Sequence, residues 1–462
     1  MSLLIVGLDN TIVNVALPSI GRELDAGVSG LQWIVSAYTL TIASLLLLSG
    51  SMADRFGRRR VFQLGLLLFT LGSLLCSLAP NLGFLIVFRM LQAIGGSMLN
   101  PVAMSIIRNT FADPRERAQA IGVWGATVGA SLALGPVLGG VLVQTVGWRS
   151  IFWINIPVGL AAIALTARFV PESRAPHPRR FDPVGQLLVI VLLGSLTYAI
   201  IQGPSLGWLS APELGLFAVA AAALAALIWQ ETHHEEPLIE LRFFRSVPFS
   251  GATVIAVCAF AALGGYLFLN TLYLQEDRGL SPLHAGLLTL PIAAMTLIFA
   301  PLSGRIVGRR GSRVPLVLGG LGITVSSLML TGLSGTTPVG WLVASYFIFG
   351  IGFGLVNPPI TVTAVAGMPA AQAGVAAAVA STSRQIGQTF GVAIVGAIAA
   401  PAALGALHLG LAHASHPGWW FTAGCGAVVF ILGLASTTAR ALKTARVASA
   451  QFGEADRLAV GV

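Results

Sequence analysis

Charged side chains are scarce in this sequence. Asp, Glu, Lys and Arg make up 9% of the 462 residues, whereas 55% are hydrophobic. A soluble domain carries about 25% charged residues, so these charges are too few to cover a water-exposed surface of this size. Long apolar stretches alternate with short charged loops, and a membrane-spanning helix needs about 20 mostly apolar residues. The composition therefore predicts a polytopic helical membrane protein.

Cysteine and lysine are almost absent. The three cysteines, Cys76, Cys258 and Cys425, fall in apolar stretches without paired spacing, so neither a disulfide framework nor a metal site is indicated. The single lysine, Lys443, follows a leucine, which excludes a glycine-rich phosphate loop with its obligatory lysine. We therefore expect no metal and no bound cofactor, and an ion gradient is the remaining source of energy for any transport.

Fourteen predominantly apolar stretches stand between polar breaks, and we predict that each spans the membrane as a helix. An even number of spans puts both termini on the same side. The predicted spans are residues 2–20, 31–52, 61–79, 82–107, 118–142, 149–169, 184–202, 212–230, 249–270, 284–303, 314–333, 338–360, 373–397 and 418–438.

Basic residues gather on one side of these spans. With a cytoplasmic N-terminus, 21 of the 26 Lys and Arg residues lie in cytoplasmic segments, and only Arg22, Arg149 and Arg278 lie on the other side. Because cytoplasmic loops are enriched in Lys and Arg, we predict a multi-pass cell-membrane protein with both termini in the cytoplasm. The net charge of +9 then requires no nucleic-acid partner. The first stretch lacks a basic leader, so we expect a retained helix and not a cleaved signal peptide.

An internal repeat divides the chain. FRMLQAIGGSMLNP at 88–101 is echoed by YFIFGIGFGLVNPP at 346–359, with Asn100-Pro101 over Asn357-Pro358. Parallel six-helix repeats are a known transporter architecture, with the substrate site between the halves. We therefore predict an N-terminal six-helix bundle (1–170), a linker with an inserted transmembrane hairpin (171–247), a C-terminal six-helix bundle (248–438) and a cytoplasmic tail (439–462).

Four short motifs occur in the first 160 residues: LDNTIVNVALP at 8–18, GSMADRFGRRR at 50–60, GPVLGG at 135–140 and WRSIFWINIPVG at 148–159. Together they resemble signatures of the major facilitator superfamily, specifically its fourteen-helix drug:proton antiporter branch of multidrug efflux type. Arg89 followed by Gln92 is similar to the family's basic motif, although Ala93 replaces a more usual glycine. Ser131 likewise stands where the antiporter motif prefers glycine. The resemblance covers nearly the whole chain.

The resemblance implies an all-α membrane fold of two six-helix bundles plus a two-helix insertion, and proton-coupled export of a small amphipathic drug or antibiotic by alternating access. It implies a transporter and not an enzyme, functional as a monomer, whose partners are a small-molecule substrate, protons and membrane lipid. The low lysine content suggests a bacterial source. One alternative is an exporter of the same fold for a natural metabolite or lipid-like compound. A second is a non-transporting membrane sensor, against which the intramembrane Asp9 and Arg89 count.

Asp9 is the only one of the 17 acidic residues that falls well inside a predicted span. An ionisable group at membrane depth is a functional hypothesis by default. Counted along their helices, the depths of Asp9 and Arg89 differ by about 6 Å, which an arginine side chain can cover. We hypothesise that Asp9 exchanges the coupling proton and that Arg89 controls its ionisation: paired, the carboxylate stays charged; separated and desolvated, it takes up a proton. The alternative is an ion pair that only holds two helices together.

Arg384 also lies inside a predicted span, and two interpretations remain open: contact with substrate, or a structural role on backbone carbonyls and polar neighbours. Other polar and aromatic residues within spans are candidates for the substrate cavity, although aromatic residues in such positions are more often packing or interface anchors. These cavity candidates are Asn14, Gln32, Trp33, Tyr38, Gln92, Asn100, Asn357 and Arg384.

Two of the motifs carry a predicted conformational role. In the family, the loop positions matched by Gly50, Asp54, Gly57 and Arg58 resemble a latch that stabilises one conformation, whereas the positive-inside rule alone accounts for the arginines that follow. In the antiporter motif, small residues let helices approach closely in lipid and proline permits a bend. Ordinary close packing and a hinge at the interface between halves are both compatible with its residues, Gly135, Pro136, Gly139 and Gly140.

Overall fold

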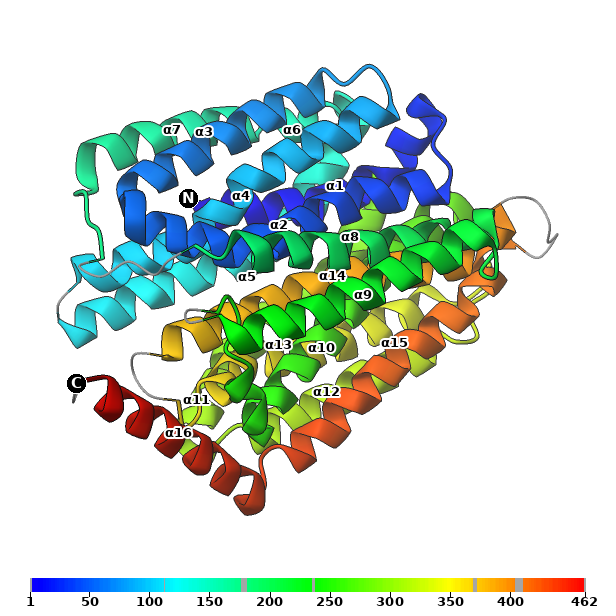
Figure 1. Ribbon diagram of the computed structural model, residues 1–462. Helices are drawn as coiled ribbons and strands as arrows, with labels where there is room; N and C mark the ends of the chain where they lie inside the picture. Colours follow the sequence, from blue (N-terminus) through cyan, green and yellow to red (C-terminus); the bar gives the residue numbers. More distant parts are fainter. Residues whose placement is uncertain are drawn as a thin grey trace.

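The computed structural model describes residues 2–111, 113–175, 181–234, 237–368, 372–403 and 410–460. All regular structure within these ranges is helical, and long helices run side by side along one axis (Figure 1). A 3₁₀ turn, η1 (Leu241–Arg245), precedes α10, and a π-helical turn, η2 (Tyr273–Asp277), follows it. The α-helices are α1 (Ser2–Leu24), α2 (Val28–Phe56), α3 (Arg58–Ser77), α4 (Leu82–Thr110), α5 (Pro114–Thr145), α6 (Ser150–Trp153), α7 (Asn155–Phe169), α8 (Pro183–Leu206), α9 (Ala211–His233), α10 (Val247–Leu272), α11 (Pro282–Arg310), α12 (Arg313–Met329), α13 (Val339–Ala364), α14 (Ala373–Ala403), α15 (Gly410–Ala435) and α16 (Ala439–Val460).

Eleven helical segments of the described chain are long and apolar enough to cross a membrane: α1 to α4, the α6–α7 pair, α8 to α11, α13 and α15. Three of the fourteen predicted spans do not reach this measure. Two of the three, in α5 and α12, have apolar segments shorter than the 18 residues that a span requires: Gly129–Thr145 and Arg313–Met329. The third, α14, carries five consecutive polar residues at 381–385. The count of fourteen therefore stays a prediction.

Helix boundaries follow capping residues and glycine breaks. The Asn81 side chain accepts a hydrogen bond from the Phe84 backbone N–H at 3.1 Å and begins α4, and the Ser281 hydroxyl caps α11 through the His284 N–H at 3.4 Å. Gly57 separates α2 from α3 with a φ of 109°, a conformation that residues with a side chain rarely adopt. These residues position tight reversals between neighbouring helices.

We call α1–α7 the first helix group and α10–α15 the second. Both contain the same close crossing of two helices. In the first group, a Cβ atom on Gly65 of α3 would lie 3.0 Å from the carbonyl oxygen of Gly95 in α4. In the second, a Cβ on Gly319 of α12 would lie 2.7 Å from the carbonyl oxygen of Gly352 in α13. Glycine lets two backbones approach in this way, so the packing repeats as the sequence does.

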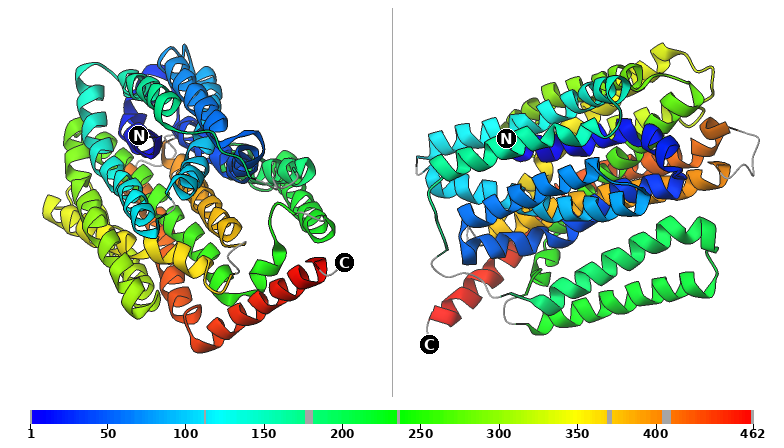
Figure 2. Two further views of the ribbon diagram at one scale, coloured as in Figure 1. Left: turned by 90° about the vertical axis from the view of Figure 1, so that its left-hand side faces the viewer. Right: turned by 90° about the horizontal axis from the view of Figure 1, so that it is seen from above.

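The helices α8 and α9 form a hairpin beside both groups (Figure 2). They pack on each other, and α8 contacts α2 of the first group and α14 of the second. The Gln186 side chain donates a hydrogen bond to the Ser44 carbonyl in α2 at 2.6 Å, and the ring of Tyr198 lies 5.7 Å from that of Trp33. The predicted tail contains α16, which runs obliquely to the other helices and packs on η1 and α10 (Figure 1).

Candidate functional site

A buried polar network surrounds the carboxylate of α1. Asp9 is 0% exposed and forms an ion pair with Arg89 of α4. The Asp9 Oδ1 atom accepts hydrogen bonds from Gln92 Nε2 at 2.8 Å and from Asn155 Nδ2 at 3.0 Å. Both amides also donate to the Ser73 hydroxyl in α3, at 2.7 and 3.3 Å. The network therefore ties α1, α3, α4 and the start of α7 together around one negative charge.

The Arg89 guanidinium, 1% exposed, has neutral partners besides Asp9. It donates to the Gln92 Oε1 atom at 2.7 Å and to the Ile34 carbonyl at 3.3 Å. Its central carbon lies 4.0 Å from the centroid of the Tyr38 ring, within the range of a cation–π interaction. Protonation of Asp9 would thus leave Arg89 with neutral partners from α2 and α4.

The second group holds a neutral cluster at the equivalent place. Tyr346 is the repeat position of Arg89, and its hydroxyl donates to Asn270 Oδ1 at 2.5 Å. The Tyr266 hydroxyl lies 3.1 Å from that of Ser326 and 3.2 Å from that of Ser345. All five residues are at most 1% exposed. The repeat thus preserves a buried polar cluster and replaces its charges with hydroxyl and amide groups.

The two ends of the helix groups differ in charge. We call the end that carries the α2–α3 and α4–α5 loops the basic end, and the end that carries the α1–α2 loop the opposite end. The hydrogen bonds and ion pairs that we describe between the groups run from mid-depth toward the opposite end. They join Arg22 to Glu276 at 3.2 Å, Gln275 Nε2 to the Val15 carbonyl at 2.8 Å, Gln32 Nε2 to the Ala393 carbonyl at 2.7 Å, and the Thr39 and Thr389 hydroxyls at 2.7 Å.

A cavity of about 390 Å³ lies at the basic end. Its walls come from α2 and α4 of the first group, α14 of the second, and the segments that flank the hairpin. Most of the lining is apolar, with Asp54, Arg108 and Asp182 as charged residues. This size and composition suit a small amphipathic molecule. The groups therefore enclose space at the basic end and are bonded together toward the opposite end.

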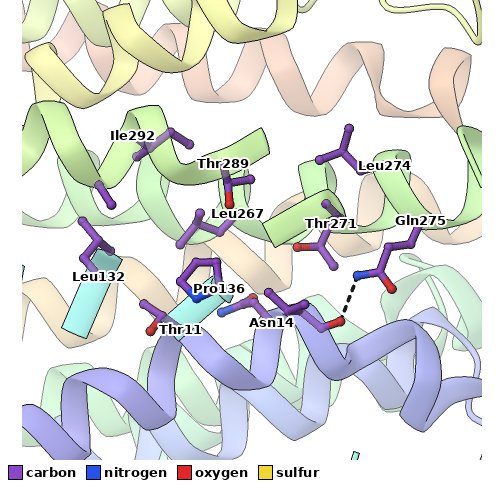
Figure 3. Close-up of a pocket in the computed structure, with 13 residues that line it drawn as sticks. Thr11, Asn14, Leu132, Pro136, Leu267, Thr271, Leu274, Gln275, Thr289 and Ile292 are labelled. Carbon is purple, nitrogen blue, oxygen red and sulfur yellow. Dashed lines mark hydrogen bonds between the residues drawn. The ribbon is translucent and has the colours of Figure 1, made fainter. Parts of the chain in front are cut away.

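A much smaller cavity, of about 20 Å³, lies between α1, α5, α10 and α11 (Figure 3). Asn14, Thr11, Pro136 and Gln275 contribute to its lining. Its volume accommodates little more than a water molecule. Asn14 donates to the Asn10 carbonyl at 2.8 Å, and its own side-chain oxygen has no hydrogen-bond partner among the described residues. The structure thus places Asn14 at a polar seam between the groups.

The antiporter motif packs on both groups. Gly135 and Gly139 face α1: a Cβ on Gly139 would lie 2.7 Å from the Ile12 side chain. Gly140 faces α11 of the second group, where a Cβ would lie 2.6 Å from the Leu283 Cα. Small residues are therefore required on two sides of α5. The side with Gly140 packs on the start of α11, at the opposite end. The hinge predicted here stays a prediction.

The predicted latch joins parts of the first group. Asp54 Oδ1 accepts a hydrogen bond from Arg58 Nη2 at 2.7 Å, and the Asp54 carbonyl accepts one from the Ala175 N–H at 3.0 Å. The Glu172 carboxylate accepts from the Arg59 N–H at 3.1 Å, at the start of α3. Gly50 adds no side chain and lines the cavity at the basic end. These contacts hold the α2–α3 turn to the segment after α7, and the latch role stays a prediction.

Arg384 of α14 has neutral partners. Its Nη2 atom donates to the Thr361 hydroxyl at 2.6 Å and points at the Asn357 carbonyl at 3.4 Å. The guanidinium carbon lies 5.8 Å from the centroid of the Phe260 ring. Its Nε atom is buried without a hydrogen-bond partner among the described residues, although the side chain as a whole is only half-buried.

Several predicted cavity residues lie elsewhere in this structure. Gln32, Tyr38 and Gln92 are fully buried: Gln32 bonds to α14, and the other two belong to the Asp9–Arg89 network. Trp33 faces α8 and not the space between the groups. Apolar sequence patterns give depth but not the direction of each side chain, and the role of these residues in substrate binding stays a prediction. Asn100 is half-buried, with its side-chain oxygen unpartnered among the described residues.

Two members of the network were missed by sequence reasoning. Asn155 lies in the motif at 148–159, and Ser73 lies inside an apolar stretch. Each is a polar residue embedded in a predicted span, the signal that singled out Asp9. Asn155 lies at the start of α7, directly after Ile154, and its side chain reaches Asp9 and Ser73.

A sequence model described as the Major Facilitator Superfamily matches residues 1–392 of the chain. The chain belongs to the major facilitator superfamily. It is therefore a multi-span helical membrane transporter rather than an enzyme. Its fold is similar to that in a crystal structure of a POT family transporter in complex with a thioalcohol-conjugated peptide, with a TM-score of 0.68, 17% sequence identity and 94% of each chain covered.

Within the major facilitator superfamily, the chain is similar to proteins named for drug resistance. It is 38% identical to the "Multidrug resistance protein Stp" of Mycobacterium tuberculosis over 400 residues, which cover 87% of this chain and 74% of that protein. It is also 38% identical to the "Tetracenomycin C resistance and export protein" of Streptomyces glaucescens over 403 residues, with the same two coverages. The resemblance to efflux members of the superfamily is thereby confirmed.

Proposed function

We propose that this protein is a proton-coupled exporter of small amphipathic compounds, such as drugs or antibiotics, that works by alternating access. It would sit in a bacterial cell membrane as a monomer, with fourteen spans arranged as two six-helix bundles and an inserted hairpin. Both termini would be cytoplasmic, because the basic end then faces the cytoplasm. The efflux names of its relatives support the direction of transport.

The distribution of contacts supports an inward-facing conformation. The cavity of about 390 Å³ lies at the basic end, while hydrogen bonds and an ion pair join the groups toward the opposite end. A compound from the cytoplasm or the inner leaflet could then enter between α2, α4 and α14. Export requires these contacts to separate while the basic end closes, as in the rocking of one bundle against the other.

The coupling proposal rests on the fully buried Asp9–Arg89 ion pair, in which Arg89 also contacts the neutral Gln92 side chain and the Tyr38 ring. While ionised, Asp9 holds Arg89, Gln92 and Asn155. Once Asp9 binds a proton, the charge attraction to Arg89 is lost, and Arg89 keeps Gln92 and the Tyr38 ring. The two states of one carboxyl group therefore favour two arrangements of the same residues.

The α2 helix offers a path from this pair to the opposite end. Arg89 contacts Ile34 and Tyr38, and the same helix carries Gln32 and Thr39, which bond to α14. A shift of Arg89 on protonation would move the segment of α2 that holds the groups together. In this scheme Asp9 takes up a proton from outside after the substrate has left and releases it toward the cytoplasm when the next substrate binds.

Transport by purified protein in proteoliposomes tests this proposal. With an imposed pH gradient, we expect wild-type protein to accumulate a substrate found by a susceptibility screen, and Asp9→Asn to lower gradient-driven accumulation by at least about tenfold. Exchange of labelled for unlabelled substrate without a gradient should persist in the variant, because it requires no net proton movement.

The matched control is Asp25→Asn. Asp25 is exposed in the α1–α2 loop with a φ of 50°, which asparagine also tolerates. This variant makes the same chemical change outside the network and should transport as the wild type does. Full gradient-driven accumulation by Asp9→Asn would refute the coupling role of Asp9.

A further inference from the structure

The membrane-embedded charges of the two groups do not balance. In the first group Asp9 neutralises Arg89. Between residues 248 and 438 the sequence contains two acidic residues, Glu276 and Asp277, and both lie in η2 at the opposite end. Arg384 is eleven residues into α14 from the basic end, or about 16 Å along the helix, close to mid-membrane. The second group therefore carries a positive charge at this depth for which its own helices supply no carboxylate.

The contacts of Arg384 do not compensate this charge. The Thr361 hydroxyl and the Asn357 carbonyl are neutral acceptors, and Phe260 offers only the face of its ring. The Nε donor is buried without a partner among the described residues. Buried ionisable groups in membranes are normally paired, and an unmatched one marks a substrate or ion pathway. The guanidinium thus retains donors for an acceptor that is not part of the described chain.

Arg384 lies on the same helix as part of the lining of the cavity at the basic end, but deeper in the membrane. Gly374, Val375 and Ala378 of the same helix line that cavity. Arg384 lies six residues beyond Ala378, which is about 9 Å deeper along the helix axis. The side chain is only half-buried, although α14 is packed between α2, α8, α10 and α15. Arg384 does not itself line the cavity: its guanidinium contacts α13 and α10, so a molecule from the cavity would reach it by passing between α14 and these two helices.

We infer that the exported compound carries an acidic group, such as a carboxylate, and that Arg384 binds this group as an anion. The inference rests on the proposed export function and narrows its substrate class. A guanidinium suits a carboxylate because it presents two parallel N–H donors. Export of an anion in exchange for protons moves net positive charge into the cell. An inside-negative membrane potential would therefore accelerate transport.

Matched probes test this inference. We would measure binding of pyrenebutyrate, its methyl ester and pyrenebutyl-trimethylammonium to the full-length protein in lipid nanodiscs, with empty nanodiscs subtracted. We expect the wild type to bind the acid at least about tenfold more tightly than the ester, as charged hydrogen bonds allow. Acidification that protonates the probe should remove this preference. Equal affinity for acid and ester, or tighter binding of the ammonium probe, would overturn the inference without any variant.

Variants locate the recognising charge. Arg384→Gln should reduce the acid-to-ester affinity ratio by at least about tenfold, and Arg384→Lys should retain most of it. The control Arg310→Gln removes an equal charge from an exposed position at the end of α11 and should keep the ratio. An unchanged ratio in a folded Arg384→Gln protein would contradict the assignment. Thermal unfolding reports whether each variant is folded, and the wild-type probe series decides the question if it is not.

Gradient-driven transport separates this inference from the proposed function. Accumulation of pyrenebutyrate in the vesicles, faster with a lumen-positive potential, would support both. Accumulation of the ammonium probe but not of the acid would leave proton-coupled export standing and overturn the anionic substrate class. Accumulation of neither probe, combined with no transport of any compound from the susceptibility screen, would refute export itself.

Discussion

The two helix groups share their packing but differ in the chemistry of their buried polar clusters. The crossing at Gly65 and Gly95 recurs at Gly319 and Gly352. At equivalent depth, however, the first group buries an ion pair of Asp9 and Arg89, while the second buries tyrosine, serine and asparagine. A neutral cluster can hold helices together without titrating near neutral pH. The comparison indicates that the charged cluster is retained for more than helix packing.

The largest loss of stability is expected when only one partner of the Asp9–Arg89 ion pair is removed. Arg89→Gln leaves the Asp9 carboxylate buried without its cation and should destabilise the protein by about 3–5 kcal/mol. Thermal unfolding in detergent measures this loss, and the double variant with Asp9→Asn should recover part of it. The exposed Arg22–Glu276 pair provides the control, since Arg22→Gln should cost less than about 1 kcal/mol. Wild-type stability of Arg89→Gln would contradict the predicted strength of the pair.

Smaller losses of stability, equal in the two groups, are expected at the helix crossing that both groups share. A Cβ on Gly95 or on Gly352 would press against the backbone of the crossing helix. Gly95→Ala and Gly352→Ala should therefore each cost about 1–3 kcal/mol, as overpacking does. Gly194→Ala in α8 serves as control, because open space surrounds that Cβ position. A large difference between the two alanine variants would show that the repeated crossing is not equivalent.

The smallest effect is expected in the neutral cluster. Tyr346→Phe removes the hydroxyl that bonds Asn270 and should cost about 1 kcal/mol. The pH dependence of transport should stay that of the wild type, because no charge is altered. If this variant shifted the pH profile as strongly as Asp9→Asn does, the distinction between the two clusters would be lost.

The sequence allowed the membrane class, the repeat and the Asp9–Arg89 pairing to be predicted, for physical reasons. Apolar length specifies spans, and the regular helical rise converts residue counts into depth, which brought Asp9 and Arg89 to the same level. Side-chain direction is not contained in depth. Depth alone therefore does not show that Gln32 bonds to α14 or that the Tyr38 ring faces Arg89.

Other features depend on tertiary structure. Asn155 joins the network because α7 packs on α1 and α3, and the apolar sequence of α7 does not specify which helices its side chains face. The placement of the α8–α9 hairpin against both α2 and α14 also depends on packing between distant segments. The neutral acceptors around Arg384 could not be recognised from the sequence, because depth along α13 does not show that Thr361 and the Asn357 carbonyl face α14.

Proton release on substrate binding tests the central claim most directly. In weakly buffered solution near neutral pH, purified wild-type protein should release about one proton to the solvent for each substrate that binds. Binding and protonation are linked through the state of Asp9. Asp9→Asn should exchange none, and Asp25→Asn should match the wild type. An Asp9→Asn protein that binds substrate and exchanges the same number of protons would contradict the account.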